Sequence, residues 1–423
     1  MTRTPSLTPA SKRAIDALLE AAVTSREVNA PTAVVATADE ILYFSARGER
    51  VYGKPELGTI DDQTVLQLFS CTKLITSVAV LQLVDAGKLT LDDPAVVDKY
   101  LPDLTSQPIL QKWTKDDPPQ PVLVPRRNPI TVRQLLSHTG GVGYPFLSPE
   151  LQRYLDANGI PYFMKTDGGT RAFKVPLIAE PGTRWAYGLS LDWAGILVER
   201  VTGLKLDAYF KQHIFDPLGL KLDFYATPEQ RKRWQAPTVR PKSLKGKLVV
   251  WRGLRDLPSR DQPIAQLAGG AGIVGTAKDY VGFLQGVLRS RDGRGIISPA
   301  GYAELFKSSL PASTTPEGEQ MRNDLRVMCT FLSFVDDAML EDNGLDHSVG
   351  LVINTSDSAW GRKAGSGTWG GAAKTDYWID PTSGIIAYCG VQINTDTPDL
   401  PFHELHQKFE RAVYDGLQIK STL

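Results

Sequence analysis

A serine and a lysine three residues apart, Ser70 and Lys73, stand at the start of a long apolar stretch of the sequence. Positions i and i+3 share one face of a helix, so the lysine amine would lie one turn from the serine hydroxyl. A serine hydroxyl is a weak nucleophile at neutral pH unless a base lies within hydrogen-bonding distance. Lysine serves as such a base when burial or neighbouring cations favour its neutral form. We therefore predict Ser70 as a nucleophile and Lys73 as its base.

The expected position of Ser70 at a helix start has two interpretations. A backbone N–H at the positive end of the helix could hold the oxyanion that forms when a serine attacks a carbonyl. Alternatively, Ser70 is only the N-cap, and Lys73 is an exposed residue of the first turn. The four-residue S-x-x-K pattern also recurs by chance in long proteins, so further motifs have to decide.

A second motif surrounds Tyr187, which follows a Pro-Gly turn at 181–182 and precedes a helix expected to begin at Ser190. A tyrosine beside a cationic lysine releases its proton more readily, so Tyr187 could carry a proton between Ser70 and an alcohol. The alternative is a buried aromatic ring whose hydroxyl group binds the backbone.

A third motif is the glycine-rich segment 365–373, which leads into an expected strand at 374–379. Glycines such as Gly370 and Gly371 at a strand start allow the backbone to approach a ligand closely. An N–H group at this edge could complete an oxyanion hole. The alternative is an ordinary glycine loop.

Composition excludes several classes of protein. The chain has 423 residues with 47 basic and 47 acidic side chains, so its formal charge is zero and it has no basic field to attract nucleic acid or an anionic membrane. Residues 1–10 contain no apolar signal segment, and no stretch approaches the roughly 20 apolar residues of a membrane span. We expect a cytoplasmic protein. Its three cysteines are widely spaced, which favours buried thiols over a disulfide framework or zinc site. We expect no metal and no cofactor.

Hydrophobic patterning indicates an α+β fold. Alternating or apolar runs predict strands, and 3.6-residue periodicity predicts helices near both ends of the chain. The expected strands are 33–37, 41–44, 348–353, 374–379 and 385–391, and the expected terminal helices are 10–26 and 401–416. Strands so far apart in sequence would form one antiparallel sheet with helices packed on it. We predict an α/β domain of residues 1–90 and 345–423, which carries the nucleophile helix. Residues 91–344 would form a largely helical insertion with the tyrosine motif.

Several chemical patterns are better explained as structural. The G-x-G-x-x-G match at 270–275 lacks a preceding strand and a βαβ unit, so we expect a glycine loop capped by Thr276 rather than a dinucleotide site. The segment 403–406 has no second histidine at i+4 and is predicted to be exposed helix surface rather than a zinc site. His138 has no G-x-S-x-G partner motif and is expected to be structural.

Basic residues gather in one part of the insertion despite the overall neutrality. They are Arg231, Lys232, Arg233, Arg240, Lys242, Lys245, Lys247, Arg252 and Arg255. Such a patch could dock an acidic acyl carrier protein or the phosphates of a thioester. A solvated charged face is the favoured interpretation.

The three motifs occur in the order found in one enzyme superfamily. The chain resembles the serine hydrolases that include class C β-lactamases, penicillin-binding proteins and related esterases, with S-x-x-K, a Y-x-N-like tyrosine motif and a K-T-G-like strand motif. The segments 81–104 and 130–141 extend the resemblance. It implies a β-lactamase-like fold, with Ser70 acylated, Lys73 as base and Tyr187 as proton relay. The N–H groups of Ser70 and Ala372 would form the oxyanion hole.

Within this superfamily, the segments 143–151, 187–195 and 362–381 resemble the fungal acyltransferases that add a methylbutyryl side chain in lovastatin biosynthesis. The chain departs from the β-lactamase pattern at 369–371, where Trp369-Gly370-Gly371 replaces the K-T-G-like lysine. A neutral indole cannot pair with a substrate carboxylate. We therefore expect an apolar acyl group. The aromatic residues Tyr144, Phe146, Trp185 and Trp369 would line its pocket, unless they belong to the core.

The sequence thus predicts a serine acyltransferase that moves an acyl group from a thioester or ester donor to an alcohol of a small natural product. Its partners would be these small molecules, with an acyl carrier protein as a further candidate donor. A carboxylesterase would use the same residues with water as acceptor, and hydrolysis of β-lactams or peptides is a weaker variant. A third class is a non-hydrolytic enzyme or binding protein in which Ser70 is idle.

Overall fold

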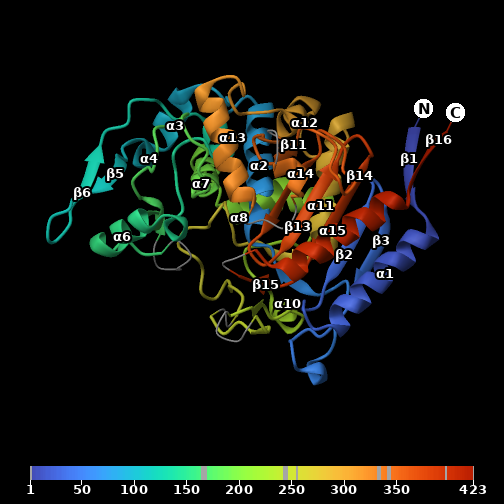
Figure 1. Ribbon diagram of the computed structural model, residues 1–423. Helices are drawn as coiled ribbons and strands as arrows, with labels where there is room; N and C mark the ends of the chain where they lie inside the picture. Colours follow the sequence, from blue (N-terminus) through green and yellow to red (C-terminus); the bar gives the residue numbers. More distant parts are fainter. Residues whose placement is uncertain are drawn as a thin grey trace.

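The structure is a computed structural model that describes residues 2–162, 169–241, 246–253, 256–330, 335–340, 344–395 and 398–422. Within these ranges the main sheet has seven strands, all antiparallel, in the order β10-β11-β12-β13-β14-β2-β3 (Figure 1). The strands are β2 (Thr32–Ala36), β3 (Ile41–Ala46), β10 (Leu345–His347), β11 (Val352–Asn354), β12 (Gly367–Gly371), β13 (Thr375–Asp380) and β14 (Ile385–Gly390). The predicted antiparallel sheet and α+β class are confirmed.

The two ends of the chain meet in this sheet. β14 pairs with β2, with Ala387 opposite Val35, although almost the whole chain separates these residues. A second pair joins the termini themselves, because β1 (Thr2–Leu7) pairs with β16 (Leu417–Thr422). Figure 1 accordingly shows the N- and C-termini side by side.

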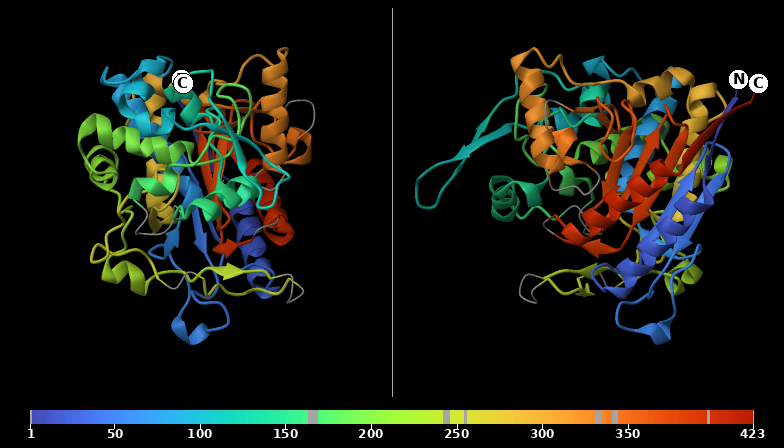
Figure 2. Two further views of the ribbon diagram at one scale, coloured as in Figure 1. Left: turned by 90° about the vertical axis from the view of Figure 1, so that its left-hand side faces the viewer. Right: turned by 45° about the vertical axis from the view of Figure 1, so that its right-hand side comes forward.

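Each face of the sheet packs against its own helices. Alternate strand residues point to opposite faces, so Tyr377 and Ile386 lie in one hydrophobic cluster while Trp378 and Ala387 lie in another. The second cluster includes residues of the terminal helices, which lie together over that face in Figure 2. The helices are α1 (Pro9–Thr24) and α15 (Leu400–Asp415) on this face, and α2 (Thr72–Asp85) and α11 (Ala277–Arg289) on the other.

The segment between the two sheet-forming ends is mostly helical. Its remaining α-helices are α3 (Pro94–Tyr100), α4 (Pro102–Thr105), α5 (Val132–Leu136), α6 (Pro149–Asn158), α7 (Ser190–Thr202), α8 (Leu206–Phe210), α9 (Asp216–Leu218), α10 (Pro228–Lys232), α12 (Pro299–Phe306), α13 (Pro316–Cys329) and α14 (Asp337–Leu340). The remaining strands of the described chain are short and lie outside the main sheet: β4 (Val65–Gln67), β5 (Ile109–Trp113), β6 (Pro121–Val124), β7 (Thr238–Val239), β8 (Val249–Val250), β9 (Val274–Thr276) and β15 (Ile393–Asn394). The β5–β6 hairpin extends away from the body in Figure 1. The domain division at 90 and 345 stays a prediction.

The helix that carries the predicted base is buried on nearly all sides. In α2 every residue from Thr72 to Leu81 is buried, as expected for a helix that is apolar around its whole circumference. The helix begins at Thr72, with Cys71 at the N-cap, and Ser70 lies in the preceding 3-10 turn, Phe69–Cys71. The alternative interpretation of Ser70 as an N-cap with an exposed Lys73 is therefore wrong.

Two expected elements differ in the structure. The predicted strand 348–353 is instead the turn between β10 and β11 followed by the first residues of β11, and Ser348 donates its N–H to the Leu351 carbonyl in that turn. Its apolar residues are buried in that turn, and a strand and a buried turn have the same hydrophobicity. The glycine-rich segment 365–373 is not simply a loop, since its residues from Gly367 to Gly371 form strand β12.

The exposure expected for 403–406 holds for Glu404 but is wrong for Leu405 and His406. The side chain of His406 is completely buried, with its ring 5.5 Å from that of Trp378. Leu405 is buried as well, so these residues belong to the face of α15 that packs on the sheet. The three cysteines are free buried thiols, as expected.

In the described part of the chain, no helix is both long and apolar enough to span a bilayer. The cytoplasmic location stays a prediction.

A buried ion pair ties α15 to the loop before β12. Arg362 Nε lies 2.9 Å from Glu410 Oε1, and neither side chain is exposed. Removal of the guanidinium leaves a carboxylate without its partner in the core. We expect Arg362→Ala to lower the free energy of unfolding by about 3–5 kcal/mol, measured by denaturant titration.

The matched control is Lys408→Ala, which removes the exposed Lys408–Glu404 ion pair of the same helix. Exposed pairs contribute less than about 1 kcal/mol. If both variants lose the same free energy of unfolding, the buried Arg362–Glu410 pair contributes no more to stability than the exposed pair.

Candidate active site

The structure brings the three predicted catalytic side chains into contact. Ser70 Oγ accepts a hydrogen bond from Lys73 Nζ at 3.1 Å and one from the Tyr187 hydroxyl at 2.7 Å. Ser70 precedes α2, Lys73 lies in its first turn, and Tyr187 comes from the segment before α7. Ser70 and Tyr187 are partly exposed while Lys73 is buried, so a substrate can reach the hydroxyl and water has little access to the amine.

Lys73 makes three hydrogen bonds in this buried position. Besides Ser70, its Nζ donates to the Gly270 carbonyl at 2.8 Å and to the Tyr144 hydroxyl at 3.1 Å. Its Nζ also lies 4.6 Å from the centre of the Tyr187 ring. The three acceptors match the three N–H groups of an ammonium.

Aromatic rings hold Tyr187 in place. Its ring lies 4.9 Å from that of His138, 5.2 Å from Trp369 and 6.2 Å from Trp185. Burial lowers the pKa of His138 well below its ordinary value, and His347 and Lys73 lower it further. Burial likewise lowers the pKa of His347 to about 4. Both imidazoles are therefore neutral at neutral pH, and they shape the site without adding charge.

The predicted oxyanion segment lies beside the turn that carries the nucleophile. β12 contacts that turn, and Gly371 packs so closely on Leu68 that a side chain at Gly371 would overlap the Leu68 carbonyl oxygen. The thiol of Cys71 donates to the Thr375 carbonyl at 3.1 Å and joins the start of β13 to the same place. Ala372 is exposed in the β12–β13 turn, directly after Gly371.

The expected pocket residues divide into two groups. Tyr144 and Trp369 are each only 3% exposed, whereas Phe146 is 54% exposed and stacks on Tyr144 with ring centres 4.7 Å apart. Gly370 is partly buried in β12 and approaches Asp376. Phe146 thus offers an aromatic surface to solvent beside a residue that contacts Lys73.

Strained backbone surrounds the site. Among the described residues, the non-glycine residues with positive φ are Arg26, Phe69, His138 and Lys374, and the last three have φ of 44°, 60° and 58°. Phe69 precedes the nucleophile, His138 contacts the Tyr187 ring, and Lys374 ends the turn that follows Gly371. Such conformations cost free energy and persist where surrounding structure enforces them.

Two functional candidates were missed in the sequence. Asp192, in the first turn of α7, is completely buried and accepts the Gly270 N–H at 2.9 Å through Oδ1. Gly270 itself belongs to the glycine loop that we treated as structural, yet its carbonyl contacts Lys73. The available signal was a single carboxylate within the apolar run Leu191-Asp192-Trp193-Ala194. The expected cap is confirmed, because Thr276 accepts the Asp279 N–H at the start of α11.

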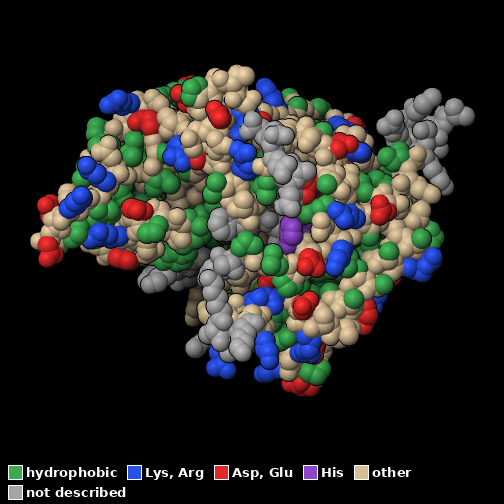
Figure 3. All heavy atoms as spheres, in the orientation of Figure 1, with side chains coloured by type: hydrophobic (Ala, Val, Ile, Leu, Met, Phe, Trp, Pro, Cys, Tyr) green, Lys and Arg blue, Asp and Glu red, His purple; other side chains and the backbone are tan. Residues whose placement is uncertain are grey.

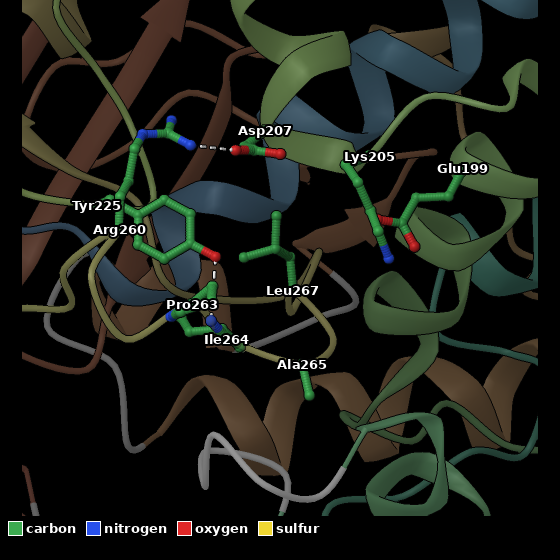
Figure 4. A pocket seen from close by; sticks show the side chains of 9 residues that line it. All are labelled: Glu199, Lys205, Asp207, Tyr225, Arg260, Pro263, Ile264, Ala265 and Leu267. Carbon is green, nitrogen blue, oxygen red and sulfur yellow. Dashed lines mark hydrogen bonds and ion pairs between the residues drawn. The ribbon is translucent and has the colours of Figure 1, made fainter.

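A separate pocket lies at the far end of α7. It has a volume of about 230 Å³. Glu199 of α7, Lys205 before α8 and the loop at 263–267 line it, as Figure 4 shows. Its polar groups bind one another, since Arg260 pairs with Asp207 at 2.8 Å. None of the predicted site residues lines it.

Most described cations of the basic segment are paired with acids. Arg231 binds Asp256, Lys232 binds Glu229, Arg233 binds Asp61 and Arg240 binds Asp399. Lys242, Lys245 and Arg255 lie outside the described residues. Basic and acidic side chains are interspersed over the face shown in Figure 3. This pairing supports the interpretation as a solvated charged face.

No group of three or more His, Cys, Asp or Glu side chains that could hold a metal ion occurs in the described ranges. The chemistry that this geometry offers is that of a serine flanked by a lysine and a tyrosine.

A family model described as beta-lactamase matches residues 15–405, so the chain belongs to the beta-lactamase family. Within it the chain is an enzyme of the acyltransferase and esterase type, as two relatives show. It is 32% identical to the acyltransferase calJ of Penicillium decumbens over 86% of this chain and 85% of calJ. It is 30% identical to the lovastatin esterase of Penicillium rubens over 95% of this chain and 98% of that protein.

A solved structure confirms the fold. Unliganded simvastatin synthase (LovD) from Aspergillus terreus matches with a TM-score of 0.81 and 28% identity, over 96% of this chain and 98% of that chain. The predicted resemblance to β-lactamase-like enzymes and fungal acyltransferases of the lovastatin pathway is confirmed.

The close packing of Gly371 on Leu68 can be tested with an alanine. A methyl group there would force β12 away from the turn that holds Ser70. We expect Gly371→Ala to cost about 1–3 kcal/mol of stability, as overpacking does elsewhere. It should also slow acylation of the protein by a small thioester, followed by intact mass.

Gly140→Ala is the control, because its added methyl would find its nearest neighbour at 3.5 Å, an ordinary contact. If both glycine variants keep the same stability and reactivity, the contact of β12 with the nucleophile turn is unimportant.

Proposed function

We propose that the protein is a serine acyltransferase that moves an apolar acyl group from a thioester or ester to an alcohol of a small natural product. The observation that carries this proposal is the placement of Ser70 Oγ between Lys73 Nζ and the Tyr187 hydroxyl. A base on one side and a proton donor on the other are what a serine needs to form and release an acyl-enzyme.

In the first half-reaction, neutral Lys73 removes the Ser70 proton while Oγ bonds to the carbonyl carbon of the donor. The N–H groups of Ser70 and Ala372 stabilise the resulting oxyanion. When the carbonyl re-forms, the bond to the leaving thiol or alcohol breaks. Tyr187 supplies the proton for that leaving group and recovers one from the Lys73 ammonium beside its ring.

The second half-reaction reverses these steps with a new nucleophile. The acceptor alcohol gives its proton through Tyr187 to Lys73 as its oxygen attacks the acyl carbon. The bond from carbon to Ser70 Oγ then breaks, and Lys73 returns the proton to Oγ. One ester or thioester is consumed and one ester is formed, and the enzyme ends unchanged.

The pocket residues favour an uncharged substrate. Trp369 occupies the place of the K-T-G-like lysine and lies against Tyr187. The lysine of the same hairpin, Lys374, is buried and interacts with Asp376 and Asp399 instead. Together with the exposed ring of Phe146, this lining suits an apolar acyl chain and an apolar acceptor better than a carboxylate.

Relatives support both the main proposal and one alternative. The names acyltransferase calJ and monacolin J acid methylbutanoyltransferase describe acyl transfer, whereas lovastatin esterase names a hydrolase of similar identity. Hydrolysis would use the same acyl-enzyme with water as acceptor. An acyl carrier protein as donor stays a prediction without support from the described basic residues, which are mostly paired.

The covalent step can be tested by mass. Incubation with a small acyl thioester should add one acyl group to the wild-type protein and none to Ser70→Ala. Tyr187→Phe should slow the addition by about 10²- to 10⁴-fold, because proton transfer loses its relay.

Cys71→Ala serves as the control, since a neighbouring thiol could also be acylated. Burial raises the pKa of Cys71 to about 12, so this variant should keep the adduct. An equal adduct on Ser70→Ala would refute the serine mechanism. If the wild-type adduct decays as fast in water as with any alcohol, the esterase alternative is correct.

A further inference from the structure

We infer that Asp192 is a positioning residue that accepts a hydrogen bond from the Tyr144 hydroxyl. The Tyr144 oxygen can then only accept from Lys73, so the lone pair of the Lys73 amine points toward Ser70, the one group with which it exchanges a proton. This inference deepens the proposed function and rests on it. It assigns a role to Asp192, which no sequence motif indicated.

The carboxylate lies beneath the lysine in the packing of α7 on α2. Asp192 Oδ1 accepts the Gly270 N–H at 2.9 Å. Its other oxygen, Oδ2, is buried and has no hydrogen-bond partner among the described residues, and the nearby Tyr144 hydroxyl interacts with the carboxyl group. Both atoms crowd Gly270, where an added Cβ would lie 2.8 Å from Oδ2 and 3.0 Å from the Tyr144 oxygen.

Asp192 thereby interacts with both Gly270 and Tyr144, the two groups other than Ser70 that accept hydrogen bonds from Lys73. It binds the N–H of Gly270, whose carbonyl accepts from Lys73 at 2.8 Å, and it interacts with Tyr144, whose oxygen accepts from Lys73 at 3.1 Å. Thr76, one turn along α2, fixes the same loop because its hydroxyl donates to the Gly269 carbonyl at 2.6 Å. The loop therefore cannot shift without breaking bonds to two helices.

The polarity of these bonds decides where the lysine lone pair points. A carbonyl oxygen can only accept, and an ionised carboxylate can only accept. If Tyr144 donates its proton to Asp192, its oxygen can only accept from Lys73. The neutral amine of Lys73 then donates its two N–H groups to the Gly270 carbonyl and the Tyr144 oxygen, and its lone pair faces Ser70. After proton transfer, the third N–H points in that same direction, so no group has to turn during the reaction.

The titration of Asp192 provides a readout of this arrangement. Burial raises its pKa to about 6, while Lys73, the Gly270 N–H and Tyr144 act in the opposite direction. The groups that face it are Lys73 from α2 and Tyr144 from the loop before α6, with Tyr162 and Tyr187 next to Tyr144. Above about pH 6 the carboxylate is ionised and can accept the tyrosine proton, and below this pH it cannot.

The test is the pH dependence of acylation in Asp192→Asn, with a small acyl thioester as the probe and thiol release as the signal. The amide would donate to Tyr144 and free the hydroxyl proton to compete for the lysine lone pair. At pH 8 we expect the acylation rate at saturating thioester to fall by about 100-fold. The half-saturating thioester concentration should not change. The wild-type rate should fall as the pH drops through about 6, and the variant should lack this step.

Two further variants separate positioning from general support of the fold. Glu199→Gln changes a carboxylate two turns along α7, which accepts the Leu206 N–H at 2.9 Å in the pocket of Figure 4. It should keep the wild-type rate and pH profile. Tyr144→Phe should also lose the step near pH 6, and adding Asp192→Asn to it should cause little further loss because the two residues act as one unit.

The outcomes distinguish this inference from the proposed function. No adduct on the wild-type protein would refute the proposed function. A wild-type adduct together with an unchanged rate and pH profile in Asp192→Asn would refute the inference alone. If Asp192→Asn does not fold, Tyr144→Phe decides between the outcomes. A fall of its acylation rate as the pH drops through about 6 refutes the inference, and the absence of that fall supports it.

Discussion

The structure depends on one constraint, that the amine of Lys73 is buried and must find all its hydrogen-bond partners inside the protein. A buried amine without partners would cost several kcal/mol or lose its proton permanently. Its acceptors come from three separate segments: the 3-10 turn before α2, the loop before α6 and the loop before β9. The packing around α2 therefore brings three distant parts of the chain within hydrogen-bonding distance of Lys73 Nζ.

The sheet contributes to this arrangement through close backbone approach. Gly371 lets β12 pack on Leu68, and Gly270 fits between Asp192 and Tyr144. In both places a methyl group would enter space already occupied. The fold thus fixes the nucleophile from the sheet side and the base from the side of α7.

Much of this could be predicted from sequence because it depends on local pattern. Ser70 and Lys73 are close through helical spacing alone, and the strands around 374–391 alternate or are continuously apolar, as buried strands are. The contact of Tyr187 with Ser70 required the order of motifs in a known family. Asp192 was missed because a carboxylate in an apolar helix indicates that a buried acid is present but does not indicate what it binds. The turn at 348–351 was mistaken for a strand because burial of its residues is decided by tertiary packing.

Phe69, His138 and Lys374 adopt left-handed backbone conformations around the site, and each would be relaxed by glycine. Because none of these positions is glycine, the surrounding structure must enforce their strained backbone conformations. Such conformations persist only while the surrounding packing enforces them, so loosening of that packing alone would relax the three positions. Selection for greater heat resistance alone would tend to relax these three positions, and with them the alignment of Ser70.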